Sequence, residues 1–271
     1  MVLLILHAFL KPIIYDITPM QLDITTDGAY KYVEVGEGKV LLLLHGLFGS
    51  LSNFEDMIAH FAPHYRVVMP FMPILEMSPR ELSVEALVDF IDGFVAHKGF
   101  DKVNVLGNSL GGHVTLLYTV KRPERINTMI LTGSSGLFEN AFGSSFPKRG
   151  DYEFIKARIE FTFYDPATAS KALVDEVFEM VNDRAKAMNI IVIAKSAIRH
   201  NLGNLLHKIT VPTSLIWGNQ DNITPPFVGE DFHKNLVNSE LHFIDLCGHA
   251  PMMEQPAQFC ALLEPFLAKH N

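Results

Sequence analysis

The sequence predicts an α/β protein in which helices flank a mostly parallel central sheet, and three observations indicate this class. Short, continuous apolar runs recur along the chain, which is typical of strands that are buried on both faces. Stretches with helical periodicity separate most of these runs. Strands that alternate with helices form a parallel sheet with helices packed on its faces. An α/β architecture is therefore expected.

The elements follow in order along the chain. Segments 21–27 and 30–35 alternate apolar and polar residues around Asp27-Gly28, so we expect an antiparallel hairpin at the edge of the sheet. The apolar runs predict buried strands at 40–44, 66–69, 103–106, 128–131, 213–217 and, with a weaker pattern, 240–244. Helical periodicity predicts helices at 52–61, 84–97, 110–121 and 255–269.

The alternation is interrupted between residues 134 and 206, a stretch that is rich in phenylalanine. It shows helical patterns at 152–163, 169–181 and 184–200, and Asp151 is the expected N-cap of the first. The chain therefore divides into an N-terminal extension (1–20), a core (21–133 and 207–271) and a helical cap or lid (134–206). Such an insertion covers the strand C-termini, where open α/β sheets bind ligands, although it could also be only a second packing layer.

Composition excludes several classes of protein. Of 271 residues, 48% are hydrophobic and 19% are charged, which is typical of a chain with a large core. The formal net charge of −8 argues against nucleic acid or an anionic membrane as a partner. The apolar run at 2–10 is too short to cross a membrane. With only two cysteines, Cys247 and Cys260, a cytoplasmic protein without disulfides is expected.

The segment G-N-S-L-G at 107–111 follows a predicted strand and begins a predicted helix. In this context G-x-S-x-G forms a nucleophile elbow, a sharp turn that exposes a serine above the sheet. Gly107 and Gly111 are needed because the helix crowds the strand and leaves no room for side chains there. The helix N-terminus beside Ser109 favours an oxyanion. Ser109 is therefore the predicted nucleophile.

A serine hydroxyl needs a base, and in proteins with this elbow the acid and the histidine follow the serine in that order. Asp221 lies in a loop that leaves a buried strand, and His249 lies just past the last strand. Both are expected at the C-terminal ends of their strands, as Ser109 is. The rival acids are Asp245, which is too close to His249 in sequence, and Asp231, which lies too far along the chain.

The loop after the first buried strand, H-G-L-F-G-S at 45–50, is the expected second side of an oxyanion hole. The backbone N–H of Leu47 is the first candidate donor and that of Phe48 the second, while Leu110 supplies the donor next to the nucleophile. His45 is interpreted as a support that orients this loop, together with Gly46, although it could also be read as a base.

Four segments carry a family resemblance: H-G-L-F-G-S, G-N-S-L-G-G, W-G-N-Q-D-N-I-T-P and G-H-A-P-M-M-E-Q-P. In this order the chain resembles the α/β-hydrolase fold superfamily from about residue 33 to its end. The first motif resembles that of small bacterial carboxylesterases and acyl thioesterases. The second resembles that of meta-cleavage product hydrolases, which split carbon–carbon bonds. The chain departs from the latter family at Phe48-Gly49-Ser50, where Gly-Pro-Gly is usual, and at Ala250, where an aromatic residue is usual.

The resemblance implies a serine hydrolase with the triad Ser109, Asp221 and His249, acting on a carboxylic ester or thioester of a small, largely apolar substrate. Carbon–carbon bond hydrolysis is the first alternative, and a non-catalytic ligand-binding protein is the second. We expect no cofactor, no metal and a small-molecule partner, and the sequence does not indicate an oligomeric state. The expected pocket residues are Met69, Met72, Met252 and Met253 and the phenylalanines of the insertion, of which about half are expected to be ordinary core of the insertion instead. Candidate anion anchors are Lys148, Arg149, Arg158 and Arg199, although a solvated surface charge is the favoured interpretation of each.

Overall fold

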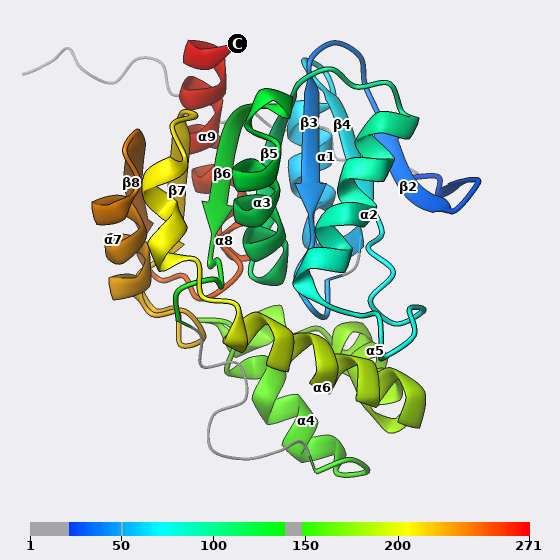
Figure 1. Ribbon diagram of the computed structural model, residues 1–271. Helices are drawn as coiled ribbons and strands as arrows, with labels where there is room; N and C mark the ends of the chain where they lie inside the picture. The colour runs from blue at the N-terminus through cyan, green and yellow to red at the C-terminus, as the bar shows by residue number, and fades with distance from the viewer. Residues whose placement is uncertain (1–21, 50, 139–147) are drawn as a thin grey trace, which may run out of the picture.

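The predicted strands lie side by side in a single sheet with the order β1-β2-β4-β3-β5-β6-β7-β8 (Figure 1). The computed structural model describes residues 22–49, 51–138 and 148–271, so the predicted extension 1–20 lies outside the described residues. The strands are β1 (Thr25–Asp27), β2 (Tyr30–Val35), β3 (Val40–Leu44), β4 (Arg66–Pro70), β5 (Val103–Asn108), β6 (Ile126–Thr132), β7 (Thr213–Gly218) and β8 (Ser239–Ile244).

The pairing of the strands confirms the predicted architecture. Strand β3 is buried at every residue and pairs in parallel with β4 and β5, and the parallel pairing continues through to β8. Strand β2 pairs in antiparallel fashion with β1 on one side and with β4 on the other, which places the hairpin at the sheet edge. Gly28 turns the hairpin with φ +60°, a conformation that glycine adopts without strain.

Helices cover both faces of the sheet (Figure 1). One face carries α1 (Glu55–Phe61), α8 (Pro251–Glu254) and α9 (Pro256–His270), and the other carries α2 (Val84–His97), α3 (Leu110–Lys121) and α7 (Pro226–Asn235). Each layer has its own apolar core, because the buried side chains of the strands alternate between the two faces. No helix in the described part of the chain combines the length and apolar character that a membrane span requires.

The three helices predicted between β6 and β7 are present as α4 (Tyr152–Glu160), α5 (Lys171–Asn182) and α6 (Arg184–Arg199). Each begins at a side chain that accepts a hydrogen bond from the first turn: Asp151, as predicted, then Ser170 and Asp183. Figure 1 shows these helices gathered at the end of the sheet toward which the strand arrows point. The insertion therefore lies beside the C-terminal ends of the strands, where the predicted site lies.

Helix α6 is joined to the core by a buried amide. The Nδ2 of Asn189 donates to the carbonyl oxygens of Ile74 and Met77, at 3.0 and 2.9 Å. Farther along α6, the hydroxyl of Ser196 accepts from the backbone N–H of Val84 at 3.2 Å. Helix α6 is thus bonded to the loop that follows β4 and to the start of α2.

The end of α6 meets helix α3 at a pair of stacked histidine rings, His113 and His200, whose Nε2 and Nδ1 atoms lie 3.3 Å apart. The Nδ1 of His113 lies 3.4 Å from the hydroxyl of Ser135, and Glu85 lies 3.3 Å from the other side of His200. His113 is fully buried. Burial, and then the charge of His200, lower the pKa of His113 from 6.5 to about 4.

A neutral, buried His113 should make the fold sensitive to acid. Between pH 6.5 and about 4 the unfolded chain binds a proton at this residue that the folded chain does not. The free energy of unfolding should therefore fall by about 1.5 kcal/mol between pH 6.5 and 5, because the slope rises from half of its full value at pH 6.5 to about 1.4 kcal/mol per pH unit below it. Urea unfolding at both pH values measures this loss, and His113→Gln should reduce it.

The exposed His233 provides the control, because His233→Gln should keep the pH dependence of the unmodified protein. Some acid sensitivity should also persist in His113→Gln, since burial lowers the pKa of His45 as well. If His113→Gln and the unmodified protein lost the same free energy between the two pH values, the assignment would be wrong.

Candidate active site

Ser109 sits at the turn between β5 and α3 with φ 55° and ψ −118°, a region that residues other than glycine rarely adopt. The surrounding backbone holds this strained conformation in place. The N–H of Ser109 donates to the carbonyl of Thr132, and the N–H of Ser135 donates to the carbonyl of Ser109, both at 3.2 Å. The end of β6 therefore holds both sides of the turn, and strain of this kind is typical of functional sites.

The glycines of the G-x-S-x-G segment are required by close backbone contacts. A Cβ at Gly107 would lie 2.4 Å from the carbonyl oxygen of Gly111. A Cβ at Gly111 would lie 2.0 Å from the carbonyl oxygen of Leu44, in the neighbouring strand β3. Real Cβ atoms do not approach backbone oxygens this closely. Helix α3 can therefore start directly against β3 and β5 only because both positions lack a side chain.

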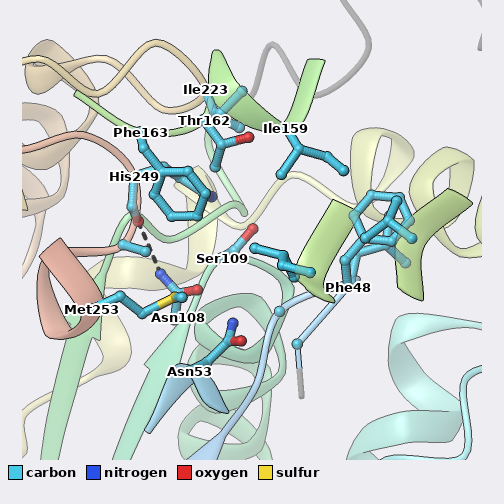
Figure 2. A pocket seen from close by; sticks show the side chains of 16 residues that line it. Phe48, Asn53, Asn108, Ser109, Ile159, Thr162, Phe163, Ile223, His249 and Met253 are labelled. Atoms are coloured by element: carbon cyan, nitrogen blue, oxygen red, sulfur yellow. Dashed lines mark hydrogen bonds between the residues drawn. The ribbon is translucent and has the colours of Figure 1, made fainter. Parts of the chain in front are cut away.

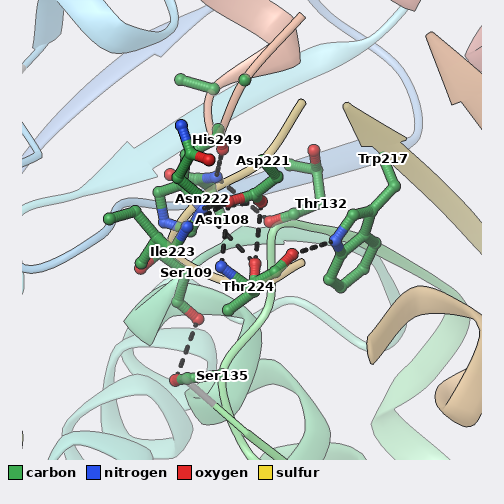
Figure 3. Close-up of polar contacts among 12 residues, drawn as sticks. Asn108, Ser109, Thr132, Ser135, Trp217, Asp221, Asn222, Ile223, Thr224 and His249 are labelled. Carbon is green, nitrogen blue, oxygen red and sulfur yellow. Dashed lines mark hydrogen bonds and ion pairs between the residues drawn. The ribbon is translucent and has the colours of Figure 1, made fainter. Parts of the chain in front are cut away.

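The carboxylate of Asp221 faces the imidazole of His249 (Figure 3). The Nδ1 of His249 lies 2.9 Å from Oδ2 and 3.1 Å from Oδ1 of Asp221. The same carboxylate accepts from the backbone N–H groups of Ile223 and Thr224, at 2.8 and 2.9 Å, and from the Thr224 hydroxyl at 2.8 Å. Asp221 is therefore fixed by the turn that it begins.

This contact sets the tautomer of the histidine. An ionised carboxylate only accepts hydrogen bonds, so the Nδ1 of His249 carries the hydrogen and the neutral ring has its lone pair on Nε2. The ring also lies close to the backbone of Gly133, since a Cβ at this position would lie only 2.8 Å from Nδ1. Gly133 has φ +51°, so this position favours glycine for two reasons.

Asn108, next to Ser109, makes a contact that the sequence pattern does not indicate. Its Nδ2 donates to the carbonyl oxygens of Thr132 and His249, both at 3.1 Å (Figures 2 and 3). The residue before the serine thus ties the backbone of the histidine loop to the end of β6. The asparagine in G-N-S was visible in the sequence, but its partner was not.

Both ring nitrogens of His45, the residue predicted to support this loop, contact the backbone. Its Nδ1 donates to the carbonyl of Gly46 at 2.8 Å, and its Nε2 accepts from the backbone N–H of Met72 at 3.1 Å. The ring must be neutral to accept this bond, and burial lowers the pKa of His45 accordingly. Of the candidate oxyanion donors, Leu47 and Phe48 line the same cavity as Ser109, while Leu110 begins α3 directly after it.

Ser109 and His249 both line a cavity of about 140 Å³ (Figure 2). From the core, the lining consists of Gly46, Leu47, Phe48, Gly49, Asn53, Asn108, Ser109, Ile223, His249, Ala250 and Met253. From the insertion, it consists of Ile159, Thr162, Phe163, Leu173 and Val177. None of these residues is Lys, Arg, Asp or Glu, so the lining is uncharged apart from any proton taken up by His249.

A family model described as the alpha/beta hydrolase fold matches residues 39–159. The chain is also 40% identical to MGS-MChE2, an alpha/beta hydrolase enzyme from the metagenome of sediments from the lagoon of Mar Chica, Morocco, whose crystal structure is known. The match covers 91% of this chain and 98% of that one, with a TM-score of 0.76. The chain belongs to the α/β-hydrolase fold family.

Curated relatives of this α/β hydrolase carry different activities in their names. The chain is 26% identical to 2-hydroxy-6-oxo-6-phenylhexa-2,4-dienoate hydrolase from Comamonas testosteroni, over 89% of this chain and 92% of the relative. It is equally 26% identical to monoacylglycerol lipase abhd6-B from Xenopus laevis, over 92% of this chain and 82% of the relative. The family is thus a family of hydrolases, whereas the bond that is cleaved differs among its members.

Several pocket residues expected from the sequence do not line the cavity of this α/β hydrolase. Of the four methionines only Met253 lines it, and the prediction was wrong for Met69, Met72 and Met252, which are buried in the two cores. Met69 belongs to β4, and Met72 follows it in a loop fixed by His45. Of the phenylalanines expected in the insertion, Phe163 lines the cavity, and Phe142 and Phe146 lie outside the described residues.

The candidate anion anchors also lie away from the cavity lining. The guanidinium of Arg158 lies 5.6 Å from the ring centre of Phe161, and the ammonium of Lys148 lies 5.9 Å from that of Phe154. The rival acid Asp245 contacts Asn219. Across the described residues, no group of three or more His, Cys, Asp or Glu side chains is placed to hold a metal ion.

Proposed function

We propose that this protein is a serine hydrolase that cleaves a carboxylic ester or thioester of a small, largely apolar acyl substrate. One observation carries the proposal: a strained serine and a histidine paired with a buried aspartate line the same uncharged cavity. A serine becomes nucleophilic when a base takes its proton, and a paired histidine is the common base for this step.

The proposed reaction has two halves. The Oγ of Ser109 attacks the carbonyl carbon while the Nε2 of His249 takes the hydroxyl proton, which it then gives to the leaving alcohol or thiol. Water hydrolyses the acyl-enzyme by the same route in reverse, releasing a carboxylic acid and restoring Ser109. Asp221 holds the imidazole in the required tautomer and stabilises its charged form. We assign the oxyanion hole to the backbone N–H groups of Leu110 and Leu47, with Phe48 as the second candidate for the latter.

We further propose that residues 134–206 act as a cap over this site. The support is that α4, α5 and the segment between them supply Ile159, Thr162, Phe163, Leu173 and Val177 to the cavity lining. A cap that excludes water strengthens the electrostatic interactions beneath it. It also limits the size of the acyl group that can bind.

The cavity volume suggests a short acyl chain or a single ring. An apolar cavity of about 150 Å³ in another protein accommodates benzene, and the present cavity has about 140 Å³. Nitrophenyl acetate, butyrate and benzoate should therefore be hydrolysed faster than the decanoate. Steady-state kinetics on this series, with a serine-directed phosphonate that titrates the nitrophenol burst, tests the proposal. A protein that gives no burst and is not labelled would instead be a non-catalytic ligand-binding protein.

Val177→Phe should narrow the range of substrates. Val177 is buried on α5 and lines the cavity, so the larger ring occupies space that the acyl group needs. We expect kcat/KM for the benzoate to fall by about tenfold or more relative to that for the acetate, since a hydrophobic pocket discriminates one methylene by about 10-fold or more. The acetate is the internal control, and an unchanged ratio would show that the acyl group binds elsewhere.

Carbon–carbon bond hydrolysis remains the second candidate. It is favoured by Asn108 beside the serine and by the dienoate hydrolase among the curated relatives. The substrates of that relative carry a carboxylate, and no Lys or Arg lines the cavity here to bind one. Parallel assays of a short ester, a thioester and a dienoate ring-cleavage product distinguish the two, because each reaction changes absorbance differently.

A further inference from the structure

The side chain of Glu254, on α8, lies between two segments that are far apart in the sequence. Its Oε1 accepts from the backbone N–H groups of Gly248 and Ala250, at 2.9 and 3.3 Å. Its Oε2 accepts from the backbone N–H of Tyr164, at 2.7 Å. One carboxylate thus bonds the residues on both sides of His249 and, at the same time, the chain that follows α4 in the insertion.

The two segments are also bonded directly beside this carboxylate. The backbone N–H of His249 donates to the carbonyl oxygen of Thr162 at 3.0 Å. Gly248 leaves no space at this junction, because a Cβ there would lie 2.7 Å from the Thr162 oxygen and 2.8 Å from the Tyr164 nitrogen. Since Thr162 itself lines the cavity, this junction connects the wall of the pocket to the backbone of His249.

The electrostatic setting of Glu254 is unusual for a glutamate. It is half-buried, and its hydrogen bonds among the described residues are made to backbone N–H groups rather than to Lys or Arg. Burial and the nearby charge of Asp221 raise the pKa of Glu254 against the effect of its three hydrogen bonds. Burial disfavours the charged form of this carboxylate, but three backbone N–H groups donate to it. Such a side chain is suited to holding the backbone in place and not to making the protein surface soluble.

We propose that Glu254 is a positioning residue, which fixes His249 by bonding the amides on either side of it and ties that loop to segment 162–164 of the insertion. This inference rests on the proposed function, because it assigns the orientation of the catalytic base to a contact with the cap. A shift in the position of segment 162–164 is thereby transmitted to the imidazole of His249. The carboxylate acts through His249 and does not itself touch the substrate.

Three substitutions separate the parts of this role. Glu254→Ala removes all three bonds. Glu254→Gln keeps the shape but replaces one oxygen with an NH₂ group, which cannot accept from a backbone N–H. Glu254→Asp is one methylene shorter, so it should not reach Gly248 and Tyr164 together. The predicted order of kcat is the unmodified protein first, Glu254→Gln next, and the Asp and Ala variants last.

The matched control is Asp183, which also uses a carboxylate to accept from two backbone N–H groups, at 2.8 and 3.0 Å, and lies in the insertion at the start of α6. Ester kinetics should show kcat lowered by about 10- to 100-fold in Glu254→Ala, since small misplacements of catalytic groups have effects of this size. KM should stay within about threefold, because the acyl pocket is retained. Asp183→Ala should keep kcat within about twofold. A Glu254→Ala protein with nearly unchanged kcat, or an equal loss in Asp183→Ala, would overturn the proposal.

Amide hydrogen exchange tests the same inference without relying on catalysis. Glu254→Ala should speed up exchange in the peptides that cover residues 160–165 and 246–251 together, whereas Asp183→Ala should leave both unchanged. If the unmodified protein hydrolysed no ester, the proposed function would fail while this measurement still decided whether the two segments are tied by Glu254. Exchange that is unaltered in both peptides would overturn the tie. If the alanine variant does not fold, the nearly isosteric Glu254→Gln serves for the same measurements, with a smaller loss of kcat and a smaller increase in exchange expected.

Discussion

Replacing Ser109 with alanine is expected to reduce kcat for ester hydrolysis by about 10⁶-fold, the loss seen when the serine or the histidine of a comparable triad is removed. The hydroxyl is the only group that is removed, and without it no acyl-enzyme forms. Residual turnover should come from binding and the oxyanion hole alone. Steady-state kinetics with nitrophenyl butyrate, together with the loss of phosphonate labelling, measures the effect.

The fold should be unaffected by this change, because the contacts that hold the elbow are made by the backbone of Ser109. Thermal unfolding of Ser109→Ala should therefore match that of the unmodified protein. Ser109→Gly is an informative companion: it should be equally inactive, while glycine removes the strain of the positive φ at this position. A folded Ser109→Ala protein that kept a tenth of the activity would contradict the assignment of the nucleophile.

The parts of the site that could be predicted are those written in short, local patterns. Strand β3 was recognised as a continuous apolar run, and the structure buries every one of its residues. The glycines around Ser109 were expected from steric crowding, and the structure supplies the crowding atoms, including the Leu44 oxygen, which would lie 2.0 Å from a Cβ at Gly111. In these places local sequence and tertiary contacts require the same residue, so a pattern of five residues is enough.

The contacts that could not be predicted join residues that are far apart in the chain. Asn108 donates to the carbonyl of a residue 141 positions later, and Glu254 accepts from the backbone N–H of a residue 90 positions earlier. Both depend on how the loops and the insertion are seated, which no local pattern records. The sequence also does not distinguish Met252 from Met253. They are neighbours on α8, yet only Met253 lines the cavity, because successive helical residues point about 100° apart.

Asp221→Asn is expected to lower kcat by about 10⁴-fold, as the same exchange does in a comparable triad, and the hydrogen bonds of Asp221 explain why. Oδ1 accepts from the backbone N–H groups of Ile223 and Thr224, at 2.8 and 2.9 Å, so an NH₂ group at that site would face two donors. The asparagine must therefore keep its oxygen there and place its NH₂ at the Oδ2 site, 2.9 Å from the Nδ1 of His249 in the present structure.

In that arrangement the new NH₂ group donates to Nδ1, so the ring hydrogen moves to Nε2 and the imidazole can no longer take the proton of Ser109. The variant should fold normally, keep a similar KM and lose kcat, which steady-state kinetics and thermal unfolding measure together. Asp245→Asn is the matched control, because that carboxylate contacts Asn219 and should leave kcat within about twofold. If the two variants lost activity equally, Asp221 would have no special part in the reaction. If only Asp221→Asn lost it, the loss would be due to the contact of Asp221 with His249, since the net charge removed from the protein is the same in both variants.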